Sequence, residues 1–180
     1  MRRLTIISTG GTIEKTYDEH SGELSNRHSI VPTMLGLLRL EDTSVNTVQL
    51  LSKDSNDLTD ADRTRIVEQV RLVVGTDSDP TECDGVVILH GTDTLCRTGE
   101  LLHEELGGCP RVPVVLTGAM RPFEMKESDA LQNLNEALFA AGHFECGVWV
   151  VAHGRALKFT GPVKDRARGT FVMGGPGMRG

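Results

Sequence analysis

The chain has 180 residues, of which 38% are hydrophobic, 24% are charged and only 4% are aromatic, and its formal net charge is −6. This composition excludes a disordered chain and predicts one soluble globular domain over residues 1–180. The acidic balance disfavours nucleic acid as a partner, and the apolar runs are too short to cross a membrane. Four scattered cysteines without a Cys-x-x-Cys pair argue against structural zinc or disulfides, so we expect a reducing cytoplasm.

Short apolar runs alternate with longer stretches of helical periodicity along the chain. In chain order they predict a strand at 4–8, a helix at 32–40, a strand at 45–51, a helix at 60–74, a strand at 85–89, a helix at 94–106, a strand at 114–117, a helix at 129–141 and a strand at 147–151. Uninterrupted apolar strands suit a sheet that is covered on both faces. The order therefore predicts an α/β fold, a three-layer αβα sandwich with a mostly parallel, Rossmann- or flavodoxin-like sheet.

Two segments lack such periodicity. The polar segment 14–29 is long and contains Gly22, so we interpret it as a candidate mobile lid. The glycine-rich tail 169–180 is expected to be loosely held.

Small, hydroxylic and acidic residues follow several predicted strands, at the edge where parallel sheets bind ligands. Thr12 follows two glycines that leave room for a ligand, and its hydroxyl suits either a nucleophile or a turn cap. Thr92 and Asp93 follow the third strand and suit either the same site or a helix cap. His90 suits a base or a packed polar residue, and the second interpretation is favoured.

A hydroxyl of ordinary pKa needs a base within hydrogen-bond reach before it can act as a nucleophile. Lys164 could serve if it lay desolvated beside Asp93 and shed its proton near neutrality. Lys158 in the same segment is a competing candidate, and the spacing does not decide between them. Either lysine could instead be a solvated surface charge. Asp129 and Asn133 are interpreted as structural residues that hold a loop by hydrogen bonds.

Three strings occur in order: TGGTI at 9–13, HGTDTL at 90–95 and LTGAMRP at 116–122. Together with the string SDA at 128–130 and the pair NL at 133–134, they resemble the signatures of the bacterial-type L-asparaginase family over about residues 4–171. The resemblance implies a hydrolase that converts asparagine and water into aspartate and ammonia. It implies no metal and no organic cofactor, with a small-molecule amide as the partner.

The resemblance also assigns catalytic roles. Thr12 matches the first catalytic threonine, the expected nucleophile that forms the acyl-enzyme, although which threonine attacks first stays open. Tyr17 matches a loop tyrosine that hydrogen-bonds this threonine. Thr92, Asp93 and Lys164 match a second catalytic group of threonine, aspartate and lysine.

Substrate-binding roles follow from the same resemblance. Ser52 matches the residue that holds the substrate α-carboxylate, and Asp93 is expected to bind the α-ammonium. Backbone N–H groups near Gly11 and Thr92 would supply neutral donors. Ala119 would contribute a backbone contact to the side-chain amide.

Two features depart from the family pattern. Lys53 stands where better-known members carry glutamine, and it would either repel a substrate ammonium or help to hold a carboxylate. Those members are also about twice as long, with a second domain that completes the pocket across a dimer interface. The chain therefore resembles short, single-domain asparaginases without the second domain, and we expect a homo-oligomer, either a dimer or a tetramer.

Two alternatives belong to other functional classes. The glycine loop after the first strand also resembles the phosphate loop of a flavodoxin-like FMN carrier, but one Trp and one Tyr offer little for stacking a flavin. A non-catalytic amino-acid-binding homologue is the other alternative. Retention of both threonines, Asp93 and a candidate lysine speaks against it.

Overall fold

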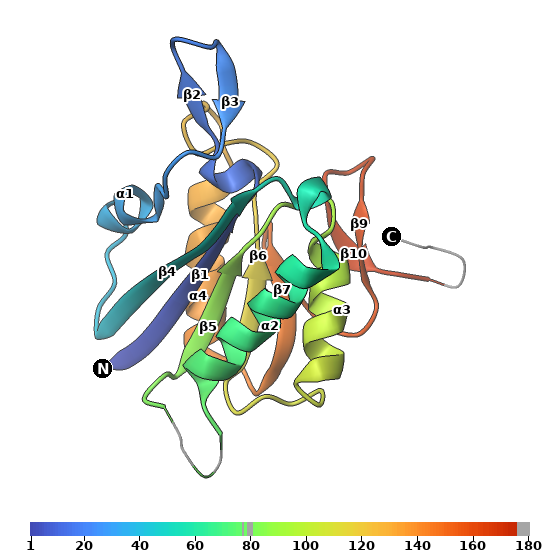
Figure 1. Cartoon of the computed structure of the whole chain (residues 1–180). Coiled ribbons are helices and arrows are strands. Elements are labelled where there is room, and N and C mark those ends of the chain that lie inside the picture. The colour runs from blue at the N-terminus through green and yellow to red at the C-terminus, as the bar shows by residue number, and fades with distance from the viewer. Residues whose placement is uncertain (77, 79–80, 176–180) are drawn as a thin grey trace.

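The computed structural model describes residues 1–76, 78 and 81–175, and they form three layers around a six-stranded sheet (Figure 1). In spatial order the strands are β4 (Thr43–Lys53), β1 (Arg2–Gly10), β5 (Gly85–Leu89), β6 (Pro113–Thr117), β7 (Gly147–Ala152) and β8 (Arg155–Lys158). All pairings are parallel except that of β8, which runs antiparallel to β7. The predicted αβα sandwich with a mostly parallel sheet is confirmed.

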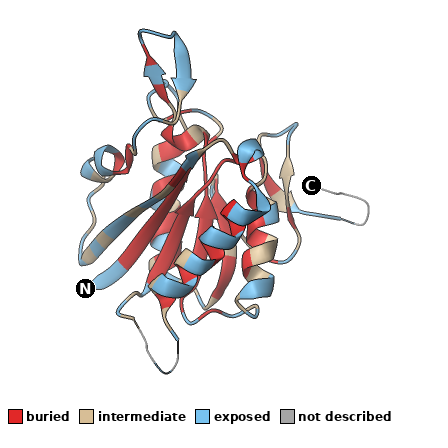
Figure 2. Ribbon diagram, in the orientation of Figure 1, coloured by how far each residue is buried: buried red, intermediate tan, exposed pale blue. Residues whose placement is uncertain are grey.

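Helices cover both faces of this sheet. α2 (Asp60–Val74) and α3 (Leu95–Glu105) pack on one face, and α1 (Val31–Gly36) and α4 (Ala130–His143) pack on the other. Successive strand residues point to opposite layers, so Ile7 and Ile88 join the α2 and α3 side whereas Ile6 joins the α4 side. The central strands are buried along their length, as Figure 2 shows.

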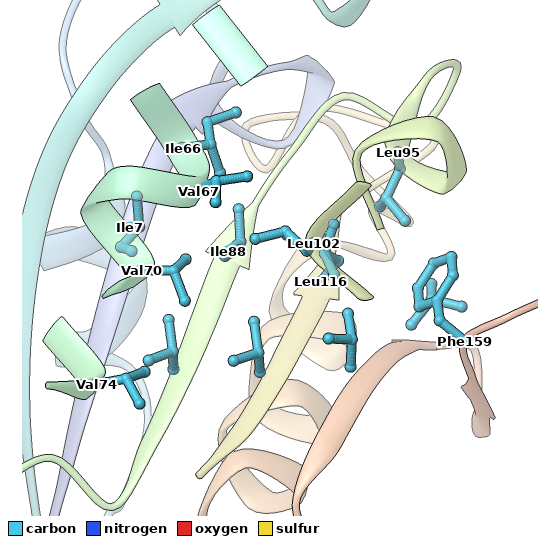
Figure 3. Packing of buried hydrophobic residues seen from close by; sticks show 14 of the residues in the cluster. Ile7, Ile66, Val67, Val70, Val74, Ile88, Leu95, Leu102, Leu116 and Phe159 are labelled. Atoms are coloured by element: carbon cyan, nitrogen blue, oxygen red, sulfur yellow. The ribbon is translucent and has the colours of Figure 1, made fainter. Parts of the chain in front are cut away.

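The start of α2 illustrates how local sequence sets an element. The Thr59 side chain accepts a hydrogen bond from the backbone of Asp62, and the Asp62 carboxylate accepts one from the backbone of Thr59, which forms a capping box. From this start, the helical spacing of Ile66 and Val70 places both side chains on the face of α2 that packs against the sheet. They lie in the same buried cluster as Ile7 and Ile88 (Figure 3). Thr59 thus fixes the start of α2 at the residue where the predicted helix begins.

The sheet has one strand that the sequence did not predict, the edge strand β8, and the other main differences lie outside the sheet. Helix α1 ends at Gly36, four residues before the predicted end, because glycine is a poor helix residue. The segment 14–29 contains a small hairpin of β2 (Thr16–Asp18) and β3 (Glu23–Ser25) that projects from the sheet (Figure 1).

The C-terminal segment also differs from the prediction. β9 (Pro162–Asp165) and β10 (Thr170–Met173) form an antiparallel pair, and Phe171 is buried in the core. A loosely held tail is therefore wrong for residues 170–173. Residues 176–180 of that prediction lie outside the described part of the chain. Within the part described, no helix is long and apolar enough to cross a bilayer.

Candidate active site

The loops that follow β1, β4 and β5 touch one another through their backbones. Gly11 has a φ of 81°, and a Cβ atom there would lie 2.4 Å from the backbone N of Gly91. The Gly11 N–H donates to the carbonyl of Lys53 at 2.9 Å. Only glycine allows this conformation and approach without strain. The Gly11 N–H thus holds the end of β4, and the donor role of backbone N–H groups near Gly11 toward substrate stays a prediction.

The loop after β6 joins the same contact. A Cβ atom on Gly118 would lie 2.2 Å from the carbonyl oxygen of His90 and 3.1 Å from Cγ2 of Thr92. Ala119 follows and is fully buried. Because Thr12 follows Gly11 directly, the structure places both candidate threonines on loops that pack against each other.

Lys164 connects the second threonine to the aspartate beside it. Its Nζ atom donates to Oγ1 of Thr92 at 2.7 Å and to Oδ1 of Asp93 at 2.9 Å. Thr92 is 6% exposed, and the Lys164 side chain is 15% exposed. The hydrogen bond from Lys164 is the main cause that lowers the pKa of Asp93 below its ordinary value, so this carboxyl is ionised at neutral pH.

The competing lysine lies in a different environment. Lys158 donates to the carboxylate of Glu145 at 2.6 Å and lies 5.2 Å from the centroid of the Trp149 ring. The two candidates therefore differ in geometry, and the structure brings Lys164, not Lys158, to Thr92.

Two further residues contact the Asp93 carboxylate. Arg166 donates to Oδ1 at 2.8 Å, and the Asn56 side chain donates to Oδ2 at 3.3 Å. Asn56 belongs to the short 3-10 helix Ser55–Asp57, which the Asp54 side chain caps. Sequence reasoning missed both contacts, because nothing in the local pattern joins residues 56 or 166 to residue 93.

The two residues expected to bind the substrate carboxylate lie at the end of β4. Ser52 is exposed, and its hydroxyl accepts a hydrogen bond from Gln49 at 2.8 Å. Lys53 donates to Oδ2 of Asp62 at 2.8 Å, and this bond is the main cause that lowers the pKa of Asp62. The Lys53 ammonium is thus paired at the start of α2. The roles of both residues toward substrate stay predictions.

Tyr17 lies in the projecting hairpin and is 58% exposed. Its backbone N–H donates to the carboxylate of Glu124 at 2.7 Å. In the described part of the chain, no hydrogen bond joins its hydroxyl to Thr12. Contact between these two residues stays a prediction for the substrate-bound protein.

Glu14 was not singled out by the sequence, yet it is a buried carboxylate two residues after Thr12. It accepts hydrogen bonds from the hydroxyls of Ser8 in β1 and Ser29 at the far end of the hairpin segment, the latter at 2.6 Å. Burial is the main cause that raises its pKa above the ordinary value. Glu14 therefore ties both ends of the segment 14–29 to the sheet.

Asp129 and Asn133 hold the loop after β6, as interpreted from the sequence. The Asp129 carboxylate accepts hydrogen bonds from the backbone N–H groups of Met120 and Arg121 at 2.9–3.0 Å. The Asn133 side chain donates to the carbonyl of Gly118 at 2.9 Å and to Asp129 at 2.9 Å. The loop that carries Ala119 is therefore held on both sides.

His153 extends this network to the C-terminal strands, a connection that the sequence did not reveal. One of its ring nitrogens lies 2.7 Å from the Asp129 carboxylate, and the other lies 3.0 Å from the hydroxyl of Thr170 in β10. His153 has a φ of 54°, which is unusual for a residue other than glycine. Through it, the β6 loop is linked to the strand pair that carries Lys164.

His90 is the packed polar residue that the sequence favoured. It is fully buried between the carbonyl of Gly91 and the hydroxyl of Thr98, each 2.8 Å from a ring nitrogen. Burial lowers its pKa to about 4, so the ring is neutral at physiological pH. Both nitrogens have partners inside the protein, which leaves none for a substrate.

A cleft of about 980 Å³ opens beside this cluster, between the start of α3 and the β9–β10 pair. Asn56, Asp93, Lys164 and Arg166 lie on its wall. In the described ranges, no cluster of three or more His, Cys, Asp or Glu residues is suited to hold a metal ion.

The mostly parallel αβα fold, with a lysine that bonds to both Thr92 and Asp93 at the C-terminal edge of the sheet, points to a class, the α/β amidohydrolases. The family model described as "Asparaginase, N-terminal" matches residues 3–170. The chain belongs to this family.

The proteins of similar sequence include L-asparaginases and subunits of glutamyl-tRNA(Gln) amidotransferases. The L-asparaginase of Thermococcus kodakarensis is 32% identical over 148 residues, which is 82% of this chain and 43% of that protein. A glutamyl-tRNA(Gln) amidotransferase subunit from Thermoplasma acidophilum is 33% identical over 144 residues, or 78% of this chain and 33% of that protein.

Solved structures agree with these matches. "The thermostable L-asparaginase from Thermococcus kodakarensis" superposes with a TM-score of 0.82 at 30% identity, covering 95% of this chain and 51% of that chain. The "Probable Cytoplasmic L-asparaginase from Campylobacter jejuni" gives 0.70 at 26% identity, covering 93% and 49%. The chain thus spans about half of these solved chains, and 43% and 33% of the two relatives named above.

Proposed function

We propose that this domain hydrolyses the side-chain amide of a small amino acid, converting L-asparagine and water into L-aspartate and ammonia in the cytoplasm. The observation that carries the proposal is the pair of contacts from Lys164 to Thr92 and Asp93, on a loop packed against the one that bears Thr12. The relatives named as L-asparaginases support the same reaction. As in the prediction from sequence, the proposal uses no metal or organic cofactor.

The first half of the proposed reaction forms an ester. The Thr12 oxygen attacks the amide carbon, and its proton passes toward Thr92 and a neutral Lys164 amine. Asp93 stabilises the ammonium that Lys164 then becomes. When the carbon–nitrogen bond breaks, this proton moves to the leaving nitrogen, which departs as ammonia.

The second half returns the enzyme to its starting state. Water attacks the β-aspartyl ester on Thr12, and the Thr92–Lys164 pair takes the proton from this water. The ester bond breaks, the Thr12 oxygen regains a proton, and aspartate leaves. Most residues of this relay are largely buried or held by hydrogen bonds, so little reorganisation accompanies each transfer.

We propose further that the domain works as a homo-oligomer, a dimer or a tetramer, in which a neighbouring copy closes the site over Thr12. The cleft beside Asp93 is lined by the exposed side chain of Arg166, and a second copy would exclude water from it. Sedimentation analysis would show this association, and a fully active monomer would contradict it.

The test compares ammonia release from asparagine by the unaltered protein and by Thr12→Ala and Thr92→Val. We expect each substitution to lower kcat/KM by at least about 100-fold. Thr64→Val is the matched control, because Thr64 is exposed on α2 and its hydroxyl donates to the carbonyl of Asp60 one turn earlier. If both site variants kept full activity, the proposed roles of Thr12 and Thr92 would be refuted. Asparagine binding without ammonia release by the unaltered protein would instead identify a non-catalytic binder.

A further inference from the structure

The two edges of the central sheet are protected to different degrees. β8 forms one edge, is only four residues long and carries Arg155 and Lys158. β4 forms the other edge, is 11 residues long and has no charged residue, proline or glycine from Thr43 to Ser52. Short length and charged side chains keep an edge strand from pairing with another chain. The β8 edge has both devices, and the β4 edge lacks them.

The backbone of β4 is available for pairing along its outer side. β4 pairs in parallel with β1 from Thr43 to Gln49, and the Arg2 N–H donates to the carbonyl of Asp42 at 2.7 Å. In a parallel pair, alternate residues bond to the neighbouring strand. The odd-numbered residues of 43–49 therefore direct their N–H and C=O groups away from β1. Within the described part of the chain, no backbone group of another segment bonds to them.

The exposed side chains in the middle of β4 are polar but uncharged, and they are Ser44, Asn46, Thr47 and Gln49. Figure 2 shows exposed and intermediate residues along β4, whereas the central strands are buried. A strand laid beside β4 would replace the water on its outward backbone groups without burying an unpaired charge. The β4 edge therefore suits the addition of a strand.

A second copy of the same chain fits this edge. A twofold axis through the middle of β4 makes the two strands antiparallel, so that each copy offers the same surface to the other. The exposed acids Glu41 and Asp42 precede β4, and Lys53, whose side chain is 42% exposed, ends it. Antiparallel pairing sets the acidic start of one strand beside the basic end of the other. Since Glu41 and Lys53 also have partners in their own chain, these charges set the direction of pairing more than its strength.

We propose that β4 is a dimerisation edge, along which the β4 strands of two copies pair antiparallel and join two sheets into one. The Gly11 N–H donates to the carbonyl of Lys53, so the end of β4 touches the loop of Thr12. The start of the partner's strand would therefore lie beside the candidate site. This inference rests on the proposed homo-oligomer, because it names an interface of that assembly, and it does not require the proposed hydrolysis.

The test places charges near the twofold axis. Thr47 lies close to the middle of the regular stretch 43–49, so the two copies of residue 47 lie within about two residues of each other. Thr47→Lys repels its own copy and Thr47→Glu does the same, whereas an equimolar mixture pairs lysine with glutamate. Thr64→Lys and Thr64→Glu are the matched controls, because Thr64 is exposed on α2.

Association is measured by sedimentation velocity from about 1 μM to about 1 mM, at low ionic strength because salt screens exposed charges. Melting temperatures show that each variant is folded. If a Thr47 variant does not fold, Asn46→Lys and Asn46→Glu replace the pair, since Asn46 is exposed beside Thr47 in the same strand.

We expect the unaltered protein to dimerise weakly, because one strand pair is smaller than a standard protein interface. Each Thr47 variant alone should raise the Kd of the dimer by at least about 10-fold, and the mixture should restore it to within about threefold. The Thr64 variants, alone or mixed, should change the Kd by less than about twofold.

Three results would overturn the inference. They are an unaltered protein that stays monomeric at about 1 mM, a dimer whose Kd the Thr47 variants leave unchanged, and weakened association that the mixture does not restore. The second result would leave the homo-oligomer standing with a different interface.

Ammonia release from asparagine, measured on the same samples, keeps the two proposals apart. Hydrolysis by a protein that does not dimerise leaves the reaction standing and refutes the β4 edge. Dimerisation that follows the Thr47 charges, without ammonia release, supports the β4 edge and refutes the reaction.

Discussion

The loops that carry Thr12 and Thr92 and the hairpin that carries Tyr17 are held in opposite ways. The loops touch backbone to backbone, and a Cβ on Gly11 or Gly118 would collide with the strand-end loop of His90 and Gly91. The β2–β3 hairpin pairs chiefly with itself and projects away from the sheet (Figure 1). Two of its large side chains, Tyr17 and Leu24, are 58% and 40% exposed.

This difference separates a preformed part of the candidate site from an adjustable part. Preorganised groups cost little when charge develops, so the threonine loops suit chemistry. Exposed hairpin residues make few contacts that would oppose movement, so the hairpin suits closing over a ligand. Substitutions in the two regions should therefore differ sharply in their effects.

The largest effect is expected at Gly11→Ala. The φ of 81° is unfavourable for alanine, and the added Cβ would meet backbone atoms of Gly91 at 2.4–2.5 Å. We expect the free energy of unfolding to fall by about 3 kcal/mol or more, with activity lost. Urea denaturation and ammonia release would measure both.

The matched control is Gly22→Ala in the hairpin. Gly22 also has a positive φ, 71°, but the nearest atom to an added Cβ is the Tyr17 hydroxyl at 4.0 Å. The cost should be about 1 kcal/mol, from backbone strain alone. Equal destabilisation by the two substitutions would break the contrast between the regions.

The buried ring of His90 should make the threonine loops sensitive to acid. Its pKa is lowered to about 4 in the folded protein, so the unfolded chain binds more protons between that pH and about 6.5. Stability supplied by the neutral ring is complete above pH 6.5 and is lost as the pH falls toward 4. Between pH 7 and pH 5 we expect a loss of about 2 kcal/mol.

Urea denaturation at several pH values would measure this loss. His90→Gln should be less stable at pH 7, yet its stability should depend less steeply on pH. An unchanged slope in His90→Gln would show that other groups cause the acid sensitivity.

Glu14 joins the two regions, so its substitution tests how strongly the hairpin segment is held to the sheet. Glu14→Ala leaves the hydroxyls of Ser8 and Ser29 without their partner, so the free energy of unfolding should fall by about 1–2 kcal/mol. Glu14→Gln keeps a partner for each hydroxyl and should cost less.

The pH dependence adds an independent check on Glu14. Because burial raises its pKa, ionisation above the ordinary carboxyl pKa of about 4.5 works against the folded state. Glu14→Gln should therefore gain relative to the unaltered protein as the pH rises to 7, as thermal denaturation would show. A constant difference across this range would contradict a buried, ionisable Glu14.

The smallest effect is expected at Tyr17→Phe. The hydroxyl has no hydrogen bond in the described chain, so the melting temperature should not change. If the hairpin closes over substrate, kcat should fall by about tenfold or less, the usual value of one hydrogen bond. An unchanged kcat would show that the Tyr17 hydroxyl has no role in the reaction.

Strong local patterns made much of the fold predictable. Apolar runs located the five parallel strands, and helical periodicity located α2 between two of them. The β9–β10 pair was missed because each strand is only four residues long, too short for a clear alternating pattern, and its stability comes from burial of Phe171 and from pairing.

The candidate site was predictable only where a motif or a resemblance pointed to it. The resemblance indicated Lys164, and the structure places it 2.7 Å from Thr92. Arg166 and His153 act through partners that are 73 and 24 residues away in the chain, and no local pattern encodes such pairs. The sequence around Glu14 is typical of an exposed polar loop. The side chain is buried by its contacts with Ser8 and Ser29, which the local sequence does not indicate.

The position of Lys164 after every strand of the six-stranded sheet has a consequence for biosynthesis. A nascent chain that has emerged from the ribosome only as far as β8 already contains Thr12, Thr92 and Asp93, but it lacks the amine. Docking of β9 and β10 supplies this amine and buries Phe171 in one step. The proposed hydrolytic activity should therefore arise only after these two strands have emerged and closed onto the finished sheet.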